Sequence, residues 1–344
     1  MKKLNYIAVL FLLILPATIF ANGSTETSAT KANGSETKKP EMILRYSEVN
    51  SINDERALAA QQFADIIKEK TAGRIEIQVF PGAQLGDNKT VVQSLQFGSI
   101  DMCNEPPTNL KNLGVNVPYL DVFSLPFLFR DEAHAIKVMD GEVGQKLIND
   151  INNSGSKLIV LDHFVAGARN FFTKVPCTSL EEFKSLKIRV QQSAIYMDTV
   201  KAFGGSPTPT STAELYSALQ TGVVDGAEQP VKGYFNSKYY EVAKYYTVSN
   251  YMIQPSSIMI SEKTWNKLSD SDKELFKETA KTVTQNFQRD TVAKLDGQLE
   301  QLKAAGVVFG ELRDYDRWVA AVAPIYEKYG AGYQDLINQI KSVQ

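Results

Sequence analysis

The feature that most constrains the fold is one long stretch of helical periodicity, residues 271–305. Apolar side chains recur there on a single stripe: Leu275, Phe276, Ala280, Val283, Phe287, Val292, Leu295, Leu299 and Leu302. The Ser271-x-x-Glu274 pattern is typical of a helix start, and Gly306 of a helix end. A helix of about 30 residues extends ~45 Å, more than one small domain, so we expect it to lie across two domains. Two helices broken near Gly297 remain an alternative, because glycine costs about 1 kcal/mol inside a helix.

The first folded segment has the pattern of a strand, a helix and a second strand. Residues 42–47 resemble a strand, residues 54–71 carry one apolar helical face before Gly73, and residues 74–80 alternate between apolar and polar. This order and spacing predict a βαβ unit with parallel strands, and hence an α/β protein. Further strands are expected at residues 157–165, 187–190, 222–227 and 256–261, with a helix at 179–183. Two sheets with crossovers between them would fit this number of strands.

The N-terminus has the three regions of a secretory signal. Two lysines precede an apolar run, residues 6–15, and small residues lead to Ala21. The run is shorter than the roughly 20 residues that a membrane-spanning helix needs, so we expect a cleaved signal peptide, residues 1–21, and export. Residues 22–40 are polar and lack apolar periodicity, and are therefore expected to form a flexible linker.

The charge and the absent motifs exclude several classes of protein. The formal charge is −2, and becomes −4 without the signal peptide, so no basic field favours nucleic acid binding. The chain has no P-loop and no G-x-S-x-G motif, and its only histidines are His134 and His163. We therefore expect no enzyme, no metal site and no cofactor. Asp162 and His163 are strand neighbours on opposite faces, so His163 is expected to be structural or to line a ligand site.

The two cysteines, Cys103 and Cys177, leave the redox state open. An exported protein can form a disulfide, but one pair so far apart in the sequence does not make a disulfide framework. Two free, buried thiols are slightly favoured.

The middle of the chain carries several motifs in a specific order. They are Gly-Ala-Arg-Asn (167–170), Leu-Glu-Glu-Phe-Lys-Ser-Leu-Lys-Ile-Arg-Val (180–190), Gly-Gly-Ser-Pro-Thr-Pro (204–209), Glu-Leu-Tyr-Ser-Ala-Leu-Gln-Thr-Gly (214–222) and Val-Asp-Gly-Ala-Glu-Gln-Pro (224–230). Upstream stand Pro-Gly-Ala-Gln-Leu-Gly (81–86) and Leu-Pro-Phe-Leu-Phe (125–129). This ordered set closely resembles the substrate-binding subunits of TRAP transporters, the tripartite ATP-independent uptake systems, of the DctP type. The resemblance runs from about Leu44 to Arg289 and is expected to continue to the C-terminus.

The resemblance implies a two-domain periplasmic binding protein fold, with a ligand cleft between the domains and a long helix spanning both. Domain I would comprise residues 41–166 plus 255–294, and domain II residues 167–254 plus 295–344. The resemblance further implies a periplasmic monomer that captures a small organic acid and delivers it to small and large permease subunits driven by an ion gradient. A receptor of the same fold that reports to a sensor kinase remains an alternative, because fold does not fix function.

The resemblance assigns the main ligand contact to Arg189, whose family counterpart grips the ligand carboxylate. A planar guanidinium suits this role, because it makes two parallel charge-assisted hydrogen bonds to a carboxylate. Gln191, two residues on, shares its strand face and is expected to touch a ligand hydroxyl. Arg169 matches the family's second arginine; an ion pair is the alternative for either arginine. Gln229 stands where the family commonly has asparagine, so this contact is moved or lost.

The other domain contributes contacts from the ends of strands. Glu48 ends the first strand, and Asn104 and Glu105 follow a later one, where α/β sheets meet their ligands. Two positions that contact the ligand in the sialic-acid branch align here with Val49 and Pro106, which argues against that ligand. The Arg-Tyr-Ser-Glu-Val-Asn start and the Gly-Ala-Arg segment instead resemble the branches that bind uronates and aldonates, so we expect a sugar acid.

Overall fold

The structure is a computed structural model that describes residues 39–111 and 113–344, without the side chains of residues 291 and 292. The expected signal peptide and nearly all of the expected linker lie outside these residues. None of the helices in this part of the chain combines the length and the apolar composition that crossing a lipid bilayer requires.

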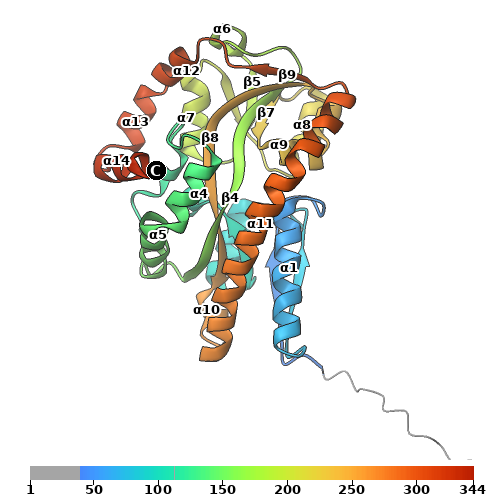
Figure 1. Ribbon diagram of the computed structural model, residues 1–344, viewed down its shortest axis with the longest axis vertical. Coiled ribbons are helices and arrows are strands. Elements are labelled where there is room, and N and C mark those ends of the chain that lie inside the picture. Colours follow the sequence, from blue (N-terminus) through green and yellow to red (C-terminus); the bar gives the residue numbers. More distant parts are fainter. Residues whose placement is uncertain (1–38, 112) are drawn as a thin grey trace, which may run out of the picture. The chain divides into compact units, whose positions relative to one another are not determined.

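One mixed sheet of nine strands runs through the described part of the chain (Figure 1), in the order β2-β1-β3-β8-β4-β7-β5-β6 with β9 paired to β8. Its strands are β1 (Met42–Ser47), β2 (Ile75–Phe80), β3 (Met102–Glu105), β4 (Leu158–Thr173), β5 (Lys187–Val190), β6 (Ser206–Pro209), β7 (Gly226–Gln229), β8 (Tyr245–Ser261) and β9 (Val308–Glu311). The expectation of two sheets is wrong. The long strands β4 and β8 pair antiparallel along most of their length and join the strands on either side.

The helices that cover this sheet are α1 (Glu55–Lys70), α2 (Asn88–Phe97), α3 (Pro107–Lys111), α4 (Glu132–Asp140), α5 (Glu142–Asn152), α6 (Leu180–Phe183), α7 (Ala194–Ala202), α8 (Leu215–Thr221), α9 (Val231–Asn236), α10 (Glu262–Trp265), α11 (Asp270–Ala304), α12 (Tyr315–Ala321), α13 (Ala323–Tyr329) and α14 (Gln334–Ser342). Short 3-10 turns occur at Leu120–Ser124 and Tyr239–Glu241.

The predicted βαβ unit is present at the start of the fold. Strands β1 and β2 are parallel, and the carboxylate of Asp54 caps α1 by accepting from the backbone N–H of Arg56. The strand predicted at residues 222–227 begins only at Gly226. The reason is that Gly222, with φ of 79°, ends α8 in the left-handed conformation.

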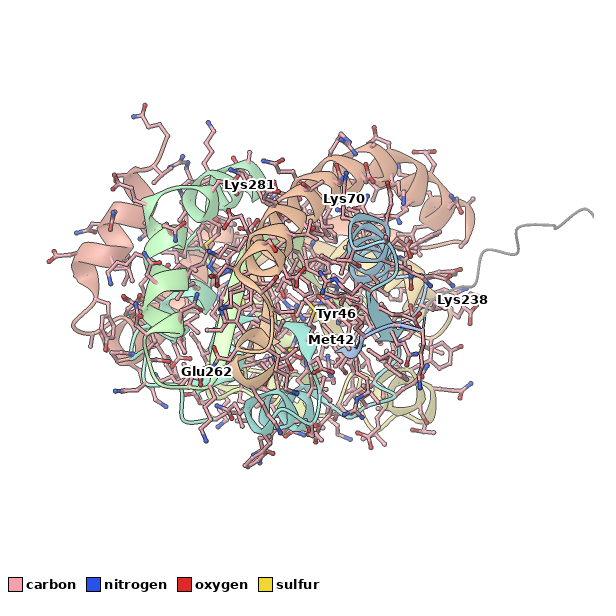
Figure 2. The ribbon with its side chains drawn as sticks, turned by 90° about the horizontal axis from the view of Figure 1, so that it is seen from below. Met42, Tyr46, Lys70, Lys238, Glu262 and Lys281 are labelled. Carbon is pink, nitrogen blue, oxygen red and sulfur yellow. The ribbon has the colours of Figure 1, made fainter. Side chains whose placement is uncertain are left out.

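Helix α11 is 35 residues long and continues through Gly297, so the alternative of two broken helices is wrong. Its cap is Ser269, which accepts from the backbone N–H of Asp272 at 3.1 Å, and not the expected Ser271. The helix packs against α1 and β4, and further along against α9. Figure 1 shows α1 and α11 side by side, and Figure 2, where Lys70 marks the end of α1, shows the pair from below.

Three apolar clusters form the core. One lies between α1, α11 and β1–β2 and includes Phe63, and another lies around β7, α8 and α9 and includes Tyr234. The largest is continuous from α2 through β5 to α12, and holds Leu95, Val190 and Trp318 together. It therefore contains residues of both expected domains.

The C-terminal helices lie beside α4 and α7 (Figure 1). The Nη1 atom of Arg130 donates to the carbonyl of Lys341 at 3.0 Å, and Nε2 of His134 lies 2.8 Å from the carbonyl oxygen of Ile340. The end of the chain, expected in domain II, thus contacts a helix expected in domain I. The division into two domains stays a prediction.

Candidate functional site

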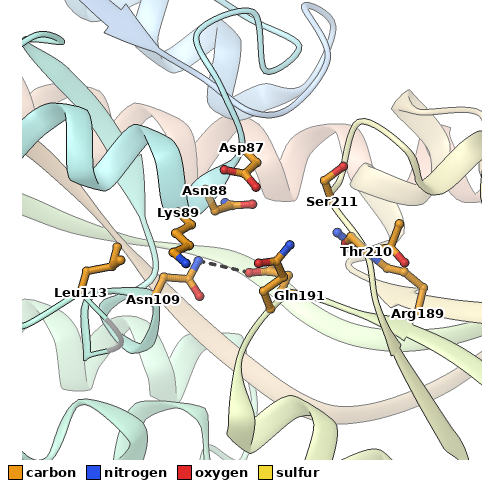
Figure 3. A pocket seen from close by; sticks show the side chains of 10 residues that line it. Asp87, Asn88, Lys89, Asn109, Leu113, Arg189, Gln191, Thr210 and Ser211 are labelled. Carbon is orange, nitrogen blue, oxygen red and sulfur yellow. Dashed lines mark hydrogen bonds between the residues drawn. The ribbon is translucent and has the colours of Figure 1, made fainter.

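Two neighbouring pockets share Asn88 and Gln191 in their lining, and the second also reaches the middle of β4 and β8. The first pocket, drawn in Figure 3, also holds Arg189 and Asn109. Figure 3 shows Asn88 and Asn109 on one side and Arg189 and Thr210 on the other. A hydrogen bond of 3.3 Å from Nδ2 of Asn109 to Oε1 of Gln191 connects the two sides.

Arg189 lies on β5 and is fully buried. Its Nε donates to the carbonyl of Thr210 at 2.8 Å, and its Nη2 donates to Oγ1 of Thr212 at 3.1 Å. Its Nη1 has no hydrogen-bond partner, and no acidic side chain of the described residues pairs with the guanidinium. Burial lowers the pKa of Arg189 from its ordinary value. A buried, uncompensated charge is costly, so the first pocket is suited to receive an anion.

Arg169 lies on β4, lines the second pocket and has an acidic partner within the chain. Its guanidinium makes a two-pronged contact with the carboxylate of Glu228 on β7, with Nη2 to Oε1 at 2.9 Å. Burial alone would lower the pKa of Arg169, but the charge and hydrogen bonding of Glu228, together with Tyr196 and Tyr251, outweigh burial and raise it. The ion pair weighed as an alternative is therefore present, and Arg169 also faces the pocket.

Arg56, in the first turn of α1, is a second-pocket residue that sequence reasoning missed. Its Nε and Nη2 contact the two carboxylate oxygens of Asp54 at 2.7 and 2.8 Å. The same Asp54 caps the helix, so the sequence pattern there indicates only a helix start. The second arginine of the second pocket is thus also neutralised by a neighbour.

Glu105 ends β3 and lines the second pocket, where it is fully buried. Amides alone contact its carboxylate among the described residues: Nδ2 of Asn88 at 2.8 and 2.9 Å, and Nδ2 of Asn109 at 2.8 Å. Burial raises the pKa of Glu105 to about 7. The carboxylate therefore changes charge near neutral pH.

Glu48 does not line the second pocket, whereas Asn50 and Asn104 do. Its carboxylate accepts from the side-chain amides of Asn104 and Asn50, and from the backbone N–H of Asn50 at 2.8 Å. Burial raises the pKa of Glu48. Glu48 therefore orients two amides that face the pocket.

The structure brings Gln229 to the second pocket but not His163. The Oε1 atom of Gln229 is buried without a hydrogen-bond partner among the described residues. His163 is buried on β4, with Nδ1 at 2.9 Å from Oγ of Ser257, and burial lowers its pKa to about 4. Of the two roles considered for His163, this placement supports the structural one. Asp162 accepts from Oγ1 of Thr284 at 2.6 Å and makes no side-chain bond to His163, as expected.

Elsewhere in the described residues, no cluster of His, Cys, Asp and Glu side chains could hold a metal ion. Cys103 and Cys177 are free and buried, as favoured from the sequence.

The amides and hydroxyls of the second pocket are the other residues that the sequence analysis missed, namely Asn50, Asn88, Thr212, Gln254 and Ser256. Such side chains occur throughout the chain. Only the folded structure brings them to one place, so no local pattern could have identified them.

Comparison with known proteins places this geometry in context. A family model described as bacterial extracellular solute-binding protein, family 7 (DctP), matches residues 46–332. A TRAP periplasmic solute-binding protein from Pseudomonas putida F1, solved with bound D-glucuronate, superimposes with a TM-score of 0.84 at 35% identity, covering 88% of this chain and 97% of that one.

Two further similar proteins bind other sugar acids. A TRAP periplasmic solute-binding protein from Polaromonas sp. JS666, solved with D-erythronate, has a TM-score of 0.83 at 31% identity, covering 88% of this chain and 99% of the other. A 2,3-diketo-L-gulonate-binding periplasmic protein of Escherichia coli (strain K12) is 31% identical over 277 residues, which are 80% of this chain and 82% of that protein.

Proposed function

Because the chain belongs to family 7 of the bacterial extracellular solute-binding proteins, as a TRAP periplasmic solute-binding protein, we propose that it captures a sugar acid, a uronate or aldonate, for uptake. The observation that carries this proposal is Arg189, a buried guanidinium with a free Nη1 and no acidic partner among the described residues. A ligand carboxylate is the partner that such a group requires.

The residues around Arg189 fit a polyhydroxylated ligand. Asn88, Asn109 and Gln191 supply amides at the junction of the two pockets, and amides can both donate to and accept from hydroxyls. Gln229 offers a buried Oε1 without a partner in the described chain, which suits a donating hydroxyl. In this proposal Arg169 shapes the pocket wall and offers N–H donors to the ligand, while its net charge is already neutralised by Glu228.

We further propose that the pockets are part of a cleft between two domains, with the boundaries expected from the sequence, and that α11 spans both. Two observations support this. The β4–β8 pairing shifts register between Val165 and Ala168, next to Arg169, and Gly167 there has φ of 106°. Such an irregularity is a suitable place for strands to bend. Export through a cleaved signal peptide and delivery to the small and large permease subunits belong to the same proposal.

A thermal-shift series tests the ligand class. D-Glucuronate, D-galacturonate, D-gluconate and D-erythronate are compared with D-glucose and D-galactose, which lack the carboxylate. A ligand present at 100 times its Kd adds about 2.7 kcal/mol to the free energy of unfolding, so at least one acid should raise the melting temperature clearly. The neutral sugars should not. Equal shifts from glucose and glucuronate would contradict the proposal.

A further inference from the structure

We propose that Glu105 makes this site selective for monocarboxylates by repelling a second carboxylate at the far end of the ligand. The proposal rests on the proposed function and deepens it, because it states which sugar acids are refused. It concerns the difference between aldonates, with one carboxylate, and aldarates, with one at each end.

The argument begins with the charges around the two pockets. Two guanidiniums have carboxylate partners within the chain, in the pairs Arg56 with Asp54 and Arg169 with Glu228. Asp87 and Lys89, which carry opposite charges, both line the first pocket. The remaining groups are one cation, Arg189, and two carboxylates held only by amides in the described chain, Glu48 and Glu105. In the second pocket, where Glu105 lies, both cations of the described lining already have carboxylate partners, so a second ligand carboxylate there meets no unpaired cation.

The geometry puts the unpaired cation and Glu105 at two ends of one continuous site. Thr212 accepts from Arg189 and lines the second pocket together with Glu105. The amide of Asn109 donates both to Glu105 at 2.8 Å and to Gln191 at 3.3 Å, and Gln191 lines both pockets. A ligand anchored at Arg189 therefore extends past Gln191 and Asn109 toward Glu105.

The two ligand classes differ in what they bring to Glu105. A terminal hydroxymethyl group donates a hydrogen bond to the carboxylate. A terminal carboxylate has no proton to donate and adds a like charge in a buried place, where screening by water is weak. The amide groups of Asn88 and Asn109 next to Glu105 already donate to its carboxylate, so they do not compensate for the added charge.

D-Gluconate and D-glucarate form the matched pair for the test, since they differ only in the hydroxymethyl or carboxylate at C6. Calorimetry at pH 8 measures both ligands on the wild-type chain, where Glu105 is ionised. Gluconate should bind at least a hundredfold more tightly than glucarate. In Glu105→Gln the ratio of gluconate affinity to glucarate affinity should fall at least tenfold, because glucarate binds more tightly.

Asp65→Asn is the matched control. It removes one carboxylate from the exposed face of α1, outside both pockets, and it should leave the ratio of the two affinities within threefold. An equal gain of glucarate binding in Asp65→Asn would show a general effect of charge and overturn the role of Glu105.

A second measurement changes the charge of Glu105 through the pH in the wild-type chain, and Glu105→Gln serves as its control. Burial raises the pKa of Glu105 to about 7, so the side chain is mostly neutral at pH 6. Lowering the pH from 8 to 6 should therefore reduce the gluconate-to-glucarate affinity ratio in the wild type but not in Glu105→Gln. The charged and titratable groups facing it are Glu48 after β1, Arg56 of α1 and Cys103 of β3. Arg56 keeps its charge between pH 6 and pH 8, and burial raises the pKa of the Cys103 thiol far above this range. Any pH dependence that remains in Glu105→Gln would come from Glu48.

The possible outcomes separate this proposal from the proposed function. Wild-type binding of both acids within threefold at pH 8, or an unchanged ratio in Glu105→Gln, overturns the role of Glu105 and leaves sugar-acid binding intact. Binding of neither gluconate nor any other sugar acid overturns both.

Discussion

Two buried arginines, Arg169 and Arg189, have similar exposure but different partners, and this difference assigns their roles. Arg169 is neutralised by Glu228, whereas Arg189 is held by the carbonyl of Thr210 and the hydroxyl of Thr212. A guanidinium paired within the chain holds the folded structure together, whereas an unpaired guanidinium is available to bind a ligand anion.

The first prediction is that Arg189→Ala weakens sugar-acid binding by roughly 3–5 kcal/mol, because it leaves the ligand carboxylate without its cation. Arg189→Lys should recover little, since an ammonium cannot reproduce the planar fork. Both variants should remain folded without ligand, because no ion pair of the described chain is broken. Calorimetry with the acid found in the thermal-shift series measures the loss.

Arg169→Ala is the contrasting variant, because it leaves the buried carboxylate of Glu228 without its partner. It should lower the free energy of unfolding of the ligand-free protein by roughly 3–5 kcal/mol in urea titrations. If Arg189→Ala instead binds within threefold of the wild type, the carboxylate is held elsewhere and Arg169 becomes the next residue to test.

The second prediction concerns the pH dependence of stability due to Glu105. Its pKa is raised to about 7 in the folded state, above the ordinary value of 4.5. Between these values the folded protein holds a proton that the unfolded chain has lost. This group therefore stabilises the fold at low pH, and its contribution falls as the pH rises from about 4.5 to 7.

Glu105→Gln removes this titration and should unfold with a flatter pH profile than the wild type. The difference in the free energy of unfolding between pH 5 and pH 8 is expected to be on the order of 2–3 kcal/mol. Urea titrations of the ligand-free proteins at both pH values measure it. Parallel profiles for the two proteins would mean that Glu105 keeps an ordinary pKa.

At the scale of elements, α11 shows that packing outweighs local propensity. Gly297 is exposed, has a helical backbone, and an added Cβ there would meet no atom within 4 Å. The helix continues because the flanking apolar residues Phe287 and Leu302 pack on the rest of the molecule.

The third prediction follows from this local freedom: Gly297→Ala should stabilise the protein by about 0.5–1 kcal/mol through the higher helix propensity of alanine. The control is Gly144→Ala in α5, where the new Cβ would lie 1.8 Å from the carbonyl oxygen of Met139. That variant should be clearly destabilised. Melting temperatures of both variants decide the matter, and a loss of stability in Gly297→Ala would indicate that α11 needs flexibility there.

At the scale of the whole molecule, the fold is more continuous than the expected two domains suggest. A single sheet passes through the described chain, and one apolar cluster joins Leu95, Val190 and Trp318. The fourth prediction is that the ligand-free protein unfolds in one cooperative transition, because neither half can lose this shared core alone. Scanning calorimetry should give equal calorimetric and van't Hoff enthalpies. Two resolved transitions would show that the halves unfold independently.

The sequence by itself determined the periodic elements and the family. The βαβ start, the strand 187–190 that carries Arg189 and the long helix α11 follow from local periodicity and turn chemistry, which a chain carries with it wherever it folds. The ordered motifs indicated a solute-binding protein, and the family match agrees. A local pattern placed Glu105 after a strand, and the family resemblance singled out Gln229; both residues line the second pocket.

Tertiary structure alone decided the rest, because it depends on which distant segments meet. The nine strands form one sheet because β4 and β8 pair across both halves, which no local pattern states. Arg56 and Asn88 face the second pocket, and His163 does not, because of how α1, α2 and β4 pack. Above all, every arginine in the sequence carries the same charge. Folding gives Arg169 and Arg56 their carboxylate partners and leaves Arg189 buried without one in the described chain.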